Sequence, residues 1–225
     1  MLDQSHLQHQ ITEEQLHDFN QLGYLIVEEV LPEELVNQLE NRIDQIYQQH
    51  LDSGYDPYSK SGMTEEKNFF YPNFLGQDQL FVNLLDWHKT FPKVWGILGW
   101  NIYSYHSHFI ITPPRKPENR DQTKPLGWHQ DSGRVNQEME SSPRPRLSLK
   151  IAYMLSDCSE PNVGNFCVIP RSHLQDTLDR PTDGSMSEQA IPICCNPGDA
   201  VFFDRRLWHA RSENDSEIIR KILFY

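Results

Sequence analysis

Two histidines and one aspartate have the residue types and the spacing of a metal-binding set. His129 and Asp131 lie two positions apart, and His209 follows a segment that reads as a turn, a strand and a short connection. Because side chains at i and i+2 point to the same side of a strand, His129 and Asp131 could face one ion together. Two histidines and a carboxylate suit non-haem Fe(II) and leave coordination positions open, although the same set also serves hydrolytic zinc. We therefore predict a metal site at His129, Asp131 and His209.

A second histidine-x-aspartate triplet, His50 to Asp52, has a different interpretation. It ends a stretch whose apolar residues have helical spacing. A histidine near the last carbonyl groups of a helix interacts favourably with the helix dipole, and the acid beside it is solvated. A triplet of this type is also expected by chance roughly once or twice in a chain of this composition. We therefore interpret His50 and Asp52 as structural.

Arg220 is a charged residue in an otherwise apolar run near the end of the sequence, over residues 218–225. Such a run predicts a core strand, and a buried guanidinium needs an anionic partner because an unpaired buried charge costs several kcal/mol. The carboxylate of a cosubstrate could accept two parallel N–H donors from it. The alternative is an arginine that reaches the rim and pairs with an acid of the protein.

These residues resemble the phytanoyl-CoA dioxygenase family of Fe(II)/2-oxoglutarate oxygenases. That family has a His-x-Asp pair, a distal histidine and an arginine at a similar distance beyond it, and the four residues named above match this order. The resemblance extends over nearly the whole chain. Its further matching segments are residues 12–19, 23–24, 31–34, 164–173 and 198–220.

The resemblance implies both a fold and a reaction. The family has a double-stranded β-helix core, and its members bind Fe(II) through the three ligands and 2-oxoglutarate through the arginine. By this resemblance Arg220 would hold the far carboxylate of 2-oxoglutarate. O2 would be the second cosubstrate, succinate and CO2 would be released, and ascorbate would serve for reactivation. The implied activity is hydroxylation, or another oxidation, of an unactivated C–H bond in a small organic molecule.

Two positions refine the implied chemistry. Some family members carry a serine two residues after the distal histidine that contacts 2-oxoglutarate. Here Arg211 holds that position and Ser212 follows, so Ser212 is the candidate for this contact. In related halogenases a small residue replaces the acid so that chloride can bind iron. Asp131 keeps the carboxylate, which favours hydroxylation over halogenation.

Three arginines after the metal pair suggest the charge of the substrate. Arg134, Arg144 and Arg146 lie in the segment 132–146 of an otherwise acidic chain. A local cationic mouth could select a carboxylate, phosphate or sulfate group. The alternative is a solvated loop whose arginines pair with nearby glutamates.

Four aromatic or histidine side chains are further candidates for the substrate pocket. Trp128 and Trp208 each neighbour a proposed ligand, although core packing explains either position equally well. His106 and His108 share one face of a predicted strand before the metal pair and could line the cavity.

Two other classes of function stay open at this stage. One is a jelly-roll hydrolase or binding protein that uses the same three ligands without 2-oxoglutarate. The other is a protein-modifying oxygenase, for which an open groove rather than a narrow cavity under a lid would be expected. Arg220 separates the first alternative from the oxygenase, because a hydrolase has no reason to bury an arginine in the metal cavity.

The elements that must position these residues change in type near residue 101. Helical spacing predicts helices over residues 12–22, 32–50 and 81–100, with a short strand at 24–27 and a long irregular loop, a candidate lid, over 52–74. Short strands separated by turns are predicted over residues 102–112, 147–154, 165–169, 190–194, 200–203 and 218–225.

This order predicts a mainly β fold in one domain, residues 1–225. Residues 1–100 supply helical support and the lid loop, and residues 101–225 form a jelly-roll, cupin-like core. The N-terminal helices are expected to pack on one sheet.

Composition excludes several classes of partner. A formal charge of -12 over 225 residues disfavours nucleic acids and anionic membrane surfaces. The sequence shows neither a secretion signal nor an apolar stretch of about 20 residues, which predicts a cytoplasmic protein. The four cysteines fit neither a disulfide framework nor a zinc knuckle and read as buried thiols. We expect a monomer or a homodimer.

Overall fold

The computed structural model describes residues 5–53, 68–120, 126–139, 141–175 and 187–225. In the N-terminal half the elements are η1 (Ser5–His9), α1 (Glu13–Leu22), β1 (Tyr24–Val27), α2 (Glu33–Asp52), β2 (Phe69–Pro72), η2 (Phe74–Gln77), α3 (Gln79–Val82) and α4 (Phe91–Leu98). The remaining elements are β3 (His108–Thr112), η3 (Pro117–Asn119), α5 (Gly133–Glu138), β4 (Leu149–Met154), β5 (Phe166–Val168), η4 (Ser172–Leu174), β6 (Ile191–Pro192), β7 (Ala200–Asp204), β8 (His209–Arg211) and β9 (Arg220–Phe224).

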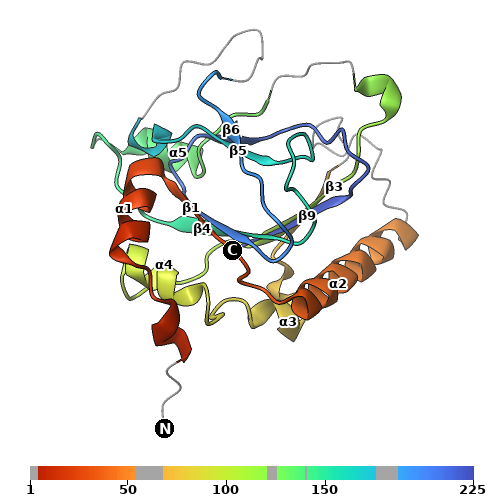
Figure 1. Ribbon diagram of the computed structural model, residues 1–225, viewed down its shortest axis with the longest axis horizontal. Coiled ribbons are helices and arrows are strands. Elements are labelled where there is room, and N and C mark those ends of the chain that lie inside the picture. The colour runs from red at the N-terminus through yellow and green to blue at the C-terminus, as the bar shows by residue number, and fades with distance from the viewer. Residues whose placement is uncertain (1–4, 54–67, 121–125, 140, 176–186) are drawn as a thin grey trace.

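Two antiparallel sheets form a jelly-roll core. The larger sheet has the order β1-β7-β4-β9-β3-β2, and the smaller one has the order β6-β5-β8. The predicted mainly β architecture with N-terminal helices is confirmed. Figure 1 shows α2, α3 and α4 along the face of the larger sheet that is turned away from β5 and β6.

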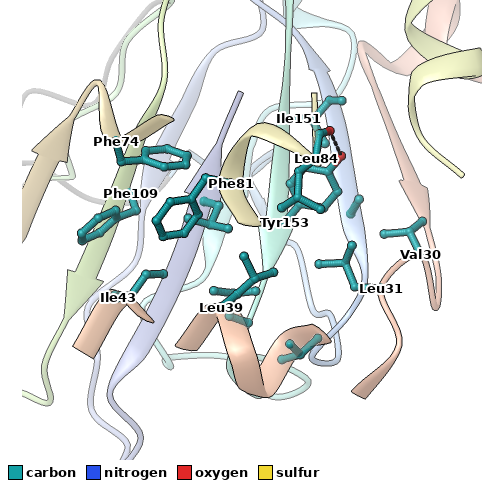
Figure 2. Packing of buried hydrophobic residues seen from close by; sticks show 14 of the residues in the cluster. Val30, Leu31, Leu39, Ile43, Phe74, Phe81, Leu84, Phe109, Ile151 and Tyr153 are labelled. Carbon is teal, nitrogen blue, oxygen red and sulfur yellow. Dashed lines mark hydrogen bonds between the residues drawn. The ribbon is translucent and has the colours of Figure 1, made fainter. Parts of the chain in front are cut away.

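Alternation along the strands of the larger sheet separates two cores. In β4, Ile151 and Tyr153 belong to the cluster beneath the helices, whereas Ala152 and Met154 belong to the cluster between the sheets. Figure 2 shows the first cluster, in which Leu39 and Ile43 of α2 lie among residues of the strands. Residues of even number on β4 and β9 therefore face the interior between the sheets, where a site can be built.

The first two helices begin and end where the sequence predicts. Thr12 and Gln15 form a reciprocal capping box at the start of α1, and Gly23 ends it in the left-handed conformation, with φ of 85°. A Cβ at Gly23 would lie 2.5 Å from Nδ1 of His173, so the close approach of the two segments also requires glycine here. Pro32 precedes α2, which continues to Asp52.

The predicted helix over residues 81–100 is wrong as a single element. The structure has the short α3, a series of turns and then α4, whose first turn contains Pro92. Proline lacks the N–H that a helix interior requires and is tolerated in the first turn, so a new helix begins there instead of the first one continuing.

The predicted loop over residues 52–74 is wrong at its C-terminal end. Residues 69–72 form the edge strand β2, which pairs with β3, and Phe69 is 3% exposed in the core beneath the helices rather than part of a lid. Pro72 ends this strand, as a residue without an N–H can at an edge. Residues 54–67 of the candidate lid lie outside the described part of the chain.

Three further boundaries differ from the sequence prediction. β3 begins only at His108, although a strand was predicted from residue 102. The segment after the metal pair contains the short helix α5, and His209 begins a strand, β8, where no strand was predicted. Both α5 and β8 are short, and elements of this length carry little periodic signal.

No helix within the described residues combines the length and the apolarity that a membrane span requires.

Candidate metal centre

The structure brings the three predicted ligands together. The ligand atoms offered by His129, Asp131 and His209 all lie within 4.8 Å of one another. His129 and His209 form an isolated antiparallel bridge, in which each N–H donates to the other carbonyl at 3.0 Å. The N–H of Asp131 donates to the carbonyl of Arg205 at 2.9 Å. Backbone pairing between distant segments therefore fixes the positions of all three side chains.

Each histidine is oriented by a carbonyl two residues before it. Nδ1 of His129 lies 2.8 Å from the carbonyl oxygen of Gly127, and Nδ1 of His209 lies 2.8 Å from that of Leu207. A carbonyl oxygen can only accept, so Nδ1 carries the hydrogen in both rings. In the neutral ring this leaves the lone pair of Nε2 for a metal, and the carbonyl acts as the outer partner that fixes the ring.

The protonation states at the centre suit metal binding. Burial, together with the nearby charge of His129, lowers the pKa of His209 to about 4, so His209 is neutral at pH 7. Burial favours the neutral form of Asp131, but His209, which is charged only at acidic pH, and Lys150, through its charge and its hydrogen bond, outweigh burial and leave the pKa of Asp131 below its ordinary value. The cluster therefore offers imidazole nitrogen and an ionised carboxylate, the donor set that suits non-haem iron.

Lys150 is a residue of this centre that was not predicted from the sequence. Its Nζ lies 2.9 Å from Oδ1 of Asp131, and both side chains are 13% exposed. The available signal was a single lysine within the apolar strand β4, where it shares the interior face with Ala152 and Met154. A lysine on that face needs an anionic partner for the same reason as Arg220 does.

Arg220 lies in the interior strand β9 and is 2% exposed. Its Nη1 lies 3.4 Å from Oγ1 of Thr112, its Nε has no hydrogen-bond partner, and no ion pair joins it to a carboxylate of the described residues. Burial lowers the pKa of Arg220 to about 10, which still leaves the guanidinium charged at pH 7. A buried cation with unused donors fits the carboxylate of a bound molecule.

The backbone at Gly164 allows this arrangement. Gly164 has φ of 69°, and a Cβ there would lie 3.4 Å from both Cδ of Arg220 and Cγ2 of Thr112. Glycine thus leaves room beside the guanidinium stem in a conformation that other residues adopt at a cost.

Ser212 lies at the end of β8 and is 7% exposed. Its N–H donates to the carbonyl of Asn165 at 2.9 Å, and its hydroxyl donates to the carbonyl of Glu213 at 3.1 Å. The hydroxyl therefore has a protein acceptor, and a contact between Ser212 and 2-oxoglutarate stays a prediction.

The two arginines that were assigned to the substrate pocket have protein partners. Arg134 forms an exposed ion pair with Glu138 at 2.7 Å on α5. Arg146 donates to Asp204 at 2.7 Å, and its guanidinium lies over the ring of Phe19. Arg146 thus joins α1 to the end of β7, and its charge is used within the protein.

The aromatic and histidine candidates divide into two groups. Trp128 and Trp208 are 4% and 8% exposed in one apolar cluster, which agrees with the packing alternative. Burial lowers the pKa of both His106 and His108, and the positive charge of Lys150 lowers both further. Nδ1 of His108 lies 3.0 Å from Nε2 of His106, so these two rings are joined at the edge of the site.

A family model and a relative in sequence each match most of the chain. The family model described as Phytanoyl-CoA dioxygenase (PhyH) matches residues 19–222. The uncharacterized protein Rv1501 of Mycobacterium tuberculosis is 23% identical over 198 residues, which are 88% of this chain and 68% of that protein.

Solved structures show the same fold. HygX from Streptomyces hygroscopicus, with nickel, 2-oxoglutarate and hygromycin B bound, has a TM-score of 0.69 at 16% identity and covers 95% of this chain and 86% of its own. EctD from S. alaskensis, with bound iron, has a TM-score of 0.69 at 19% identity over 95% of this chain and 75% of its own. The family model spans most of the sequence and includes the histidine and aspartate cluster, and the chain belongs to the phytanoyl-CoA dioxygenase family of Fe(II)/2-oxoglutarate-dependent dioxygenases.

Proposed function

We propose that this protein hydroxylates, or otherwise oxidises, an unactivated C–H bond of a small organic molecule. The observation that supports this most strongly is Arg220. It is buried, charged and without a carboxylate partner among the described residues, and it lies on the interior side of the same jelly roll as the metal ligands. A dicarboxylate cosubstrate bound between them would coordinate the metal at one end and pair with the Arg220 guanidinium at the other.

Each residue has a defined task in this proposal. His129, Asp131 and His209 would hold Fe(II), and Arg220, next to Thr112, would receive the far carboxylate of 2-oxoglutarate. When bound, iron, 2-oxoglutarate and O2 supply an oxidation that releases succinate and CO2. The protein orients these groups and excludes water from them. Asp131 keeps the carboxylate ligand, so hydroxylation is favoured over halogenation.

A hydrolytic or binding function with the same three ligands is the second candidate. The donor set alone permits it, since two histidines and an acid also bind catalytic zinc. A protein of that kind would supply no anionic partner for Arg220, and a buried charge without a partner costs several kcal/mol. Arg220 therefore weighs against it.

The substrate is proposed to be a small molecule. HygX has been solved with hygromycin B, and EctD with 5-hydroxyectoine, so structures of this fold hold small molecules beside 2-oxoglutarate. We expect ascorbate to support repeated turnover by keeping the iron reduced.

The first prediction tests the reaction class through Asp131. Purified protein with Fe(II), ascorbate and 2-oxoglutarate is expected to form succinate slowly without a substrate, and Asp131→Ala is expected to abolish this because a metal ligand is lost. Asp157→Ala, at an exposed aspartate of a turn, is the matched control and should retain the wild-type rate. Succinate is measured by mass spectrometry. Equal succinate from Asp131→Ala and wild type would refute the proposed function.

A further inference from the structure

Lys150 places a fixed positive charge next to a metal ligand. Its ammonium contacts Oδ1 of Asp131 at 2.9 Å, in surroundings that leave each side chain 13% exposed. An ammonium has three donors, and this contact uses one of them. Among the residues that the structure describes, Asp131 is the only acceptor recorded for this ammonium, which leaves two N–H groups for another acceptor near the metal centre.

The register of the larger sheet shows where Lys150 lies relative to Arg220. In the row of interior residues across the sheet, His108 pairs with Phe224 and Phe224 pairs with Ala152. Lys150 is two positions from Ala152 toward one end of the sheet, and Arg220 is four positions from Phe224 toward the other end. Lys150 and Arg220 thus lie at opposite ends of the interior face of the larger sheet. A dicarboxylate held at Arg220 would not also occupy Lys150.

The charges of the loaded site do not balance without a further anion. Two positive charges from Fe(II) and one each from Lys150 and Arg220 face one negative charge from Asp131 and two from 2-oxoglutarate. One positive charge is left over between the partly buried pair of Lys150 and Asp131 and the buried Arg220, where such an excess is costly. Asp204, the buried acid at the end of β7, does not offset this charge, because it is ion-paired to Arg206 and Arg146.

We infer that Lys150 is a substrate-binding residue that receives an anionic group, such as a carboxylate, phosphate or sulfate, beside the metal centre. This inference rests on the proposed function and gives the substrate its charge. It places the anion site not at Arg134 and Arg146, which were candidates from the sequence, but at a lysine on the interior face of β4. His106, which precedes β3 and contacts His108 ring to ring at 3.0 Å, lies at the same end of the sheet.

The second prediction measures binding of a matched pair of probes to protein loaded with Co(II) and 2-oxoglutarate. The probes are benzenesulfonate and its neutral counterpart of similar shape, methyl phenyl sulfone, and isothermal titration calorimetry gives each dissociation constant. Wild type is expected to bind the sulfonate about tenfold or more tightly than the sulfone, because a charge-assisted hydrogen bond is made only to the anion. Lys150→Met is expected to lose this preference, and Lys150→Arg to retain most of it.

Lys221→Met is the matched control for burial and ion pairing. Lys221 is 12% exposed and pairs with Asp44 at 2.8 Å, but it lies on the outer face of β9 toward α2. This variant should keep the wild-type preference. Melting temperatures of all variants establish that they are folded, and Lys150→Gln replaces Lys150→Met if the latter is not.

The outcomes separate the two proposals. Failure of the metal-loaded wild type to bind 2-oxoglutarate would refute the proposed function itself. Normal 2-oxoglutarate binding with equal affinity for the two probes would overturn only the anionic subsite. The same conclusion follows if Lys150→Met retains the full preference for benzenesulfonate.

Discussion

The metal centre is oriented by backbone carbonyls at the scale of single residues. His129 and His209 each donate from Nδ1 to the carbonyl two residues before, so the sequence neighbourhood of each ligand presets its tautomer. Oδ1 of Asp131 accepts a hydrogen bond from the ammonium of Lys150. The protein thus specifies the positions of its ligands and the tautomer of both histidines before a metal binds.

The third prediction concerns Arg220. Arg220→Met is expected to raise the 2-oxoglutarate concentration needed for half-maximal succinate formation by about tenfold to a hundredfold, because charge-assisted hydrogen bonds to one carboxylate are lost. Metal affinity should change little, since none of the three ligands is altered. Co(II) titration and 2-oxoglutarate titration measure the two effects separately.

Arg42→Met is a suitable control for this prediction. Arg42 also pairs through its guanidinium, with Asp78 at 3.0 Å, but it lies on α2 outside the jelly roll. An unchanged 2-oxoglutarate requirement in Arg220→Met would remove Arg220 from the site.

The metal ligands could be predicted from the sequence, whereas their contacts with other side chains could not. The spacing of His129, Asp131 and His209 was enough to propose a metal set, because i and i+2 share a face and the later histidine follows a recognisable turn and strand. Lys150 could not be found in this way, since its importance depends on a contact between β4 and the segment after His129. The contact of Arg146 with Asp204 could not be found either, because the two residues are 58 positions apart.

At the scale of elements, the connection between β7 and β8 decides where His209 lies. Asp204 ends β7 with no exposed surface and accepts hydrogen bonds from the backbone and side chain of Arg206 and from Arg146. The side chain of Gln130 in turn donates to the carbonyl of Arg206. Through these contacts one buried carboxylate links three parts of the chain. They are α1, the segment that carries His129 and Asp131, and the connection that leads into β8.

The fourth prediction tests this link through pH. Burial alone would favour neutral Asp204, but its hydrogen bonds to Arg206 and Arg146 prevail and hold the pKa below the ordinary value of 3.8. A lowered pKa means that the ion pairs stabilise the fold above that value and lose their effect as the pH falls through the folded-state pKa. Asp204→Asn is expected to lower the free energy of unfolding at pH 7 by about 3 kcal/mol, because two arginines lose their counterion.

Urea unfolding between pH 7 and pH 3 measures this effect. The difference between wild type and Asp204→Asn should be largest at neutral pH and should shrink as the pH falls below the ordinary value of 3.8, because the Asp204 carboxyl becomes protonated first in the unfolded chain and at lower pH in the folded protein. Asp86→Asn, at an exposed aspartate, should change the free energy of unfolding by less than about 0.5 kcal/mol. A difference that is constant with pH would contradict the assignment of stability to ionised Asp204.

Element boundaries were predictable where local chemistry marks them. The capping box at Thr12 and the left-handed Gly23 define α1 from sequence alone. β2 was not recognised because its stability comes from pairing with β3, a distant segment in which Ile111 pairs with Phe69 and His108 pairs with Pro72. The division of the predicted helix at Pro92 could have been found, since proline favours a first turn over a helix interior.

At the scale of the whole molecule, the site is shared between the two sheets. His209 lies on the three-stranded sheet, whereas Lys150 and Arg220 lie on strands of the six-stranded one. A metal bound at the ligands and a cosubstrate reaching Arg220 would therefore connect both layers. The layers themselves were predictable from alternating strands and turns, but which side chains of the two layers meet depends on register, which cannot be derived from the sequence pattern alone.

The fifth prediction follows from this shared construction. Ligands that bind only the folded state stabilise it by about 2.7 kcal/mol at a concentration about 100 times their dissociation constant. For a chain of this size that corresponds to a rise in Tm of about 5–10 °C. We expect this rise for Co(II) and 2-oxoglutarate together, and a clearly smaller one for 2-oxoglutarate alone, because the cosubstrate binds through the metal as well as through Arg220.

Differential scanning calorimetry of wild type and Arg220→Met tests the connection between layers. The variant should keep the stabilisation by Co(II) alone but lose most of the additional stabilisation by 2-oxoglutarate, since the contact on β9 is missing while the ligand cluster is intact. Succinate, which cannot chelate the metal through a keto oxygen, serves as the control ligand and should add little in either protein. An equal additional rise with 2-oxoglutarate in wild type and Arg220→Met would show that the cosubstrate does not extend across the jelly roll to β9.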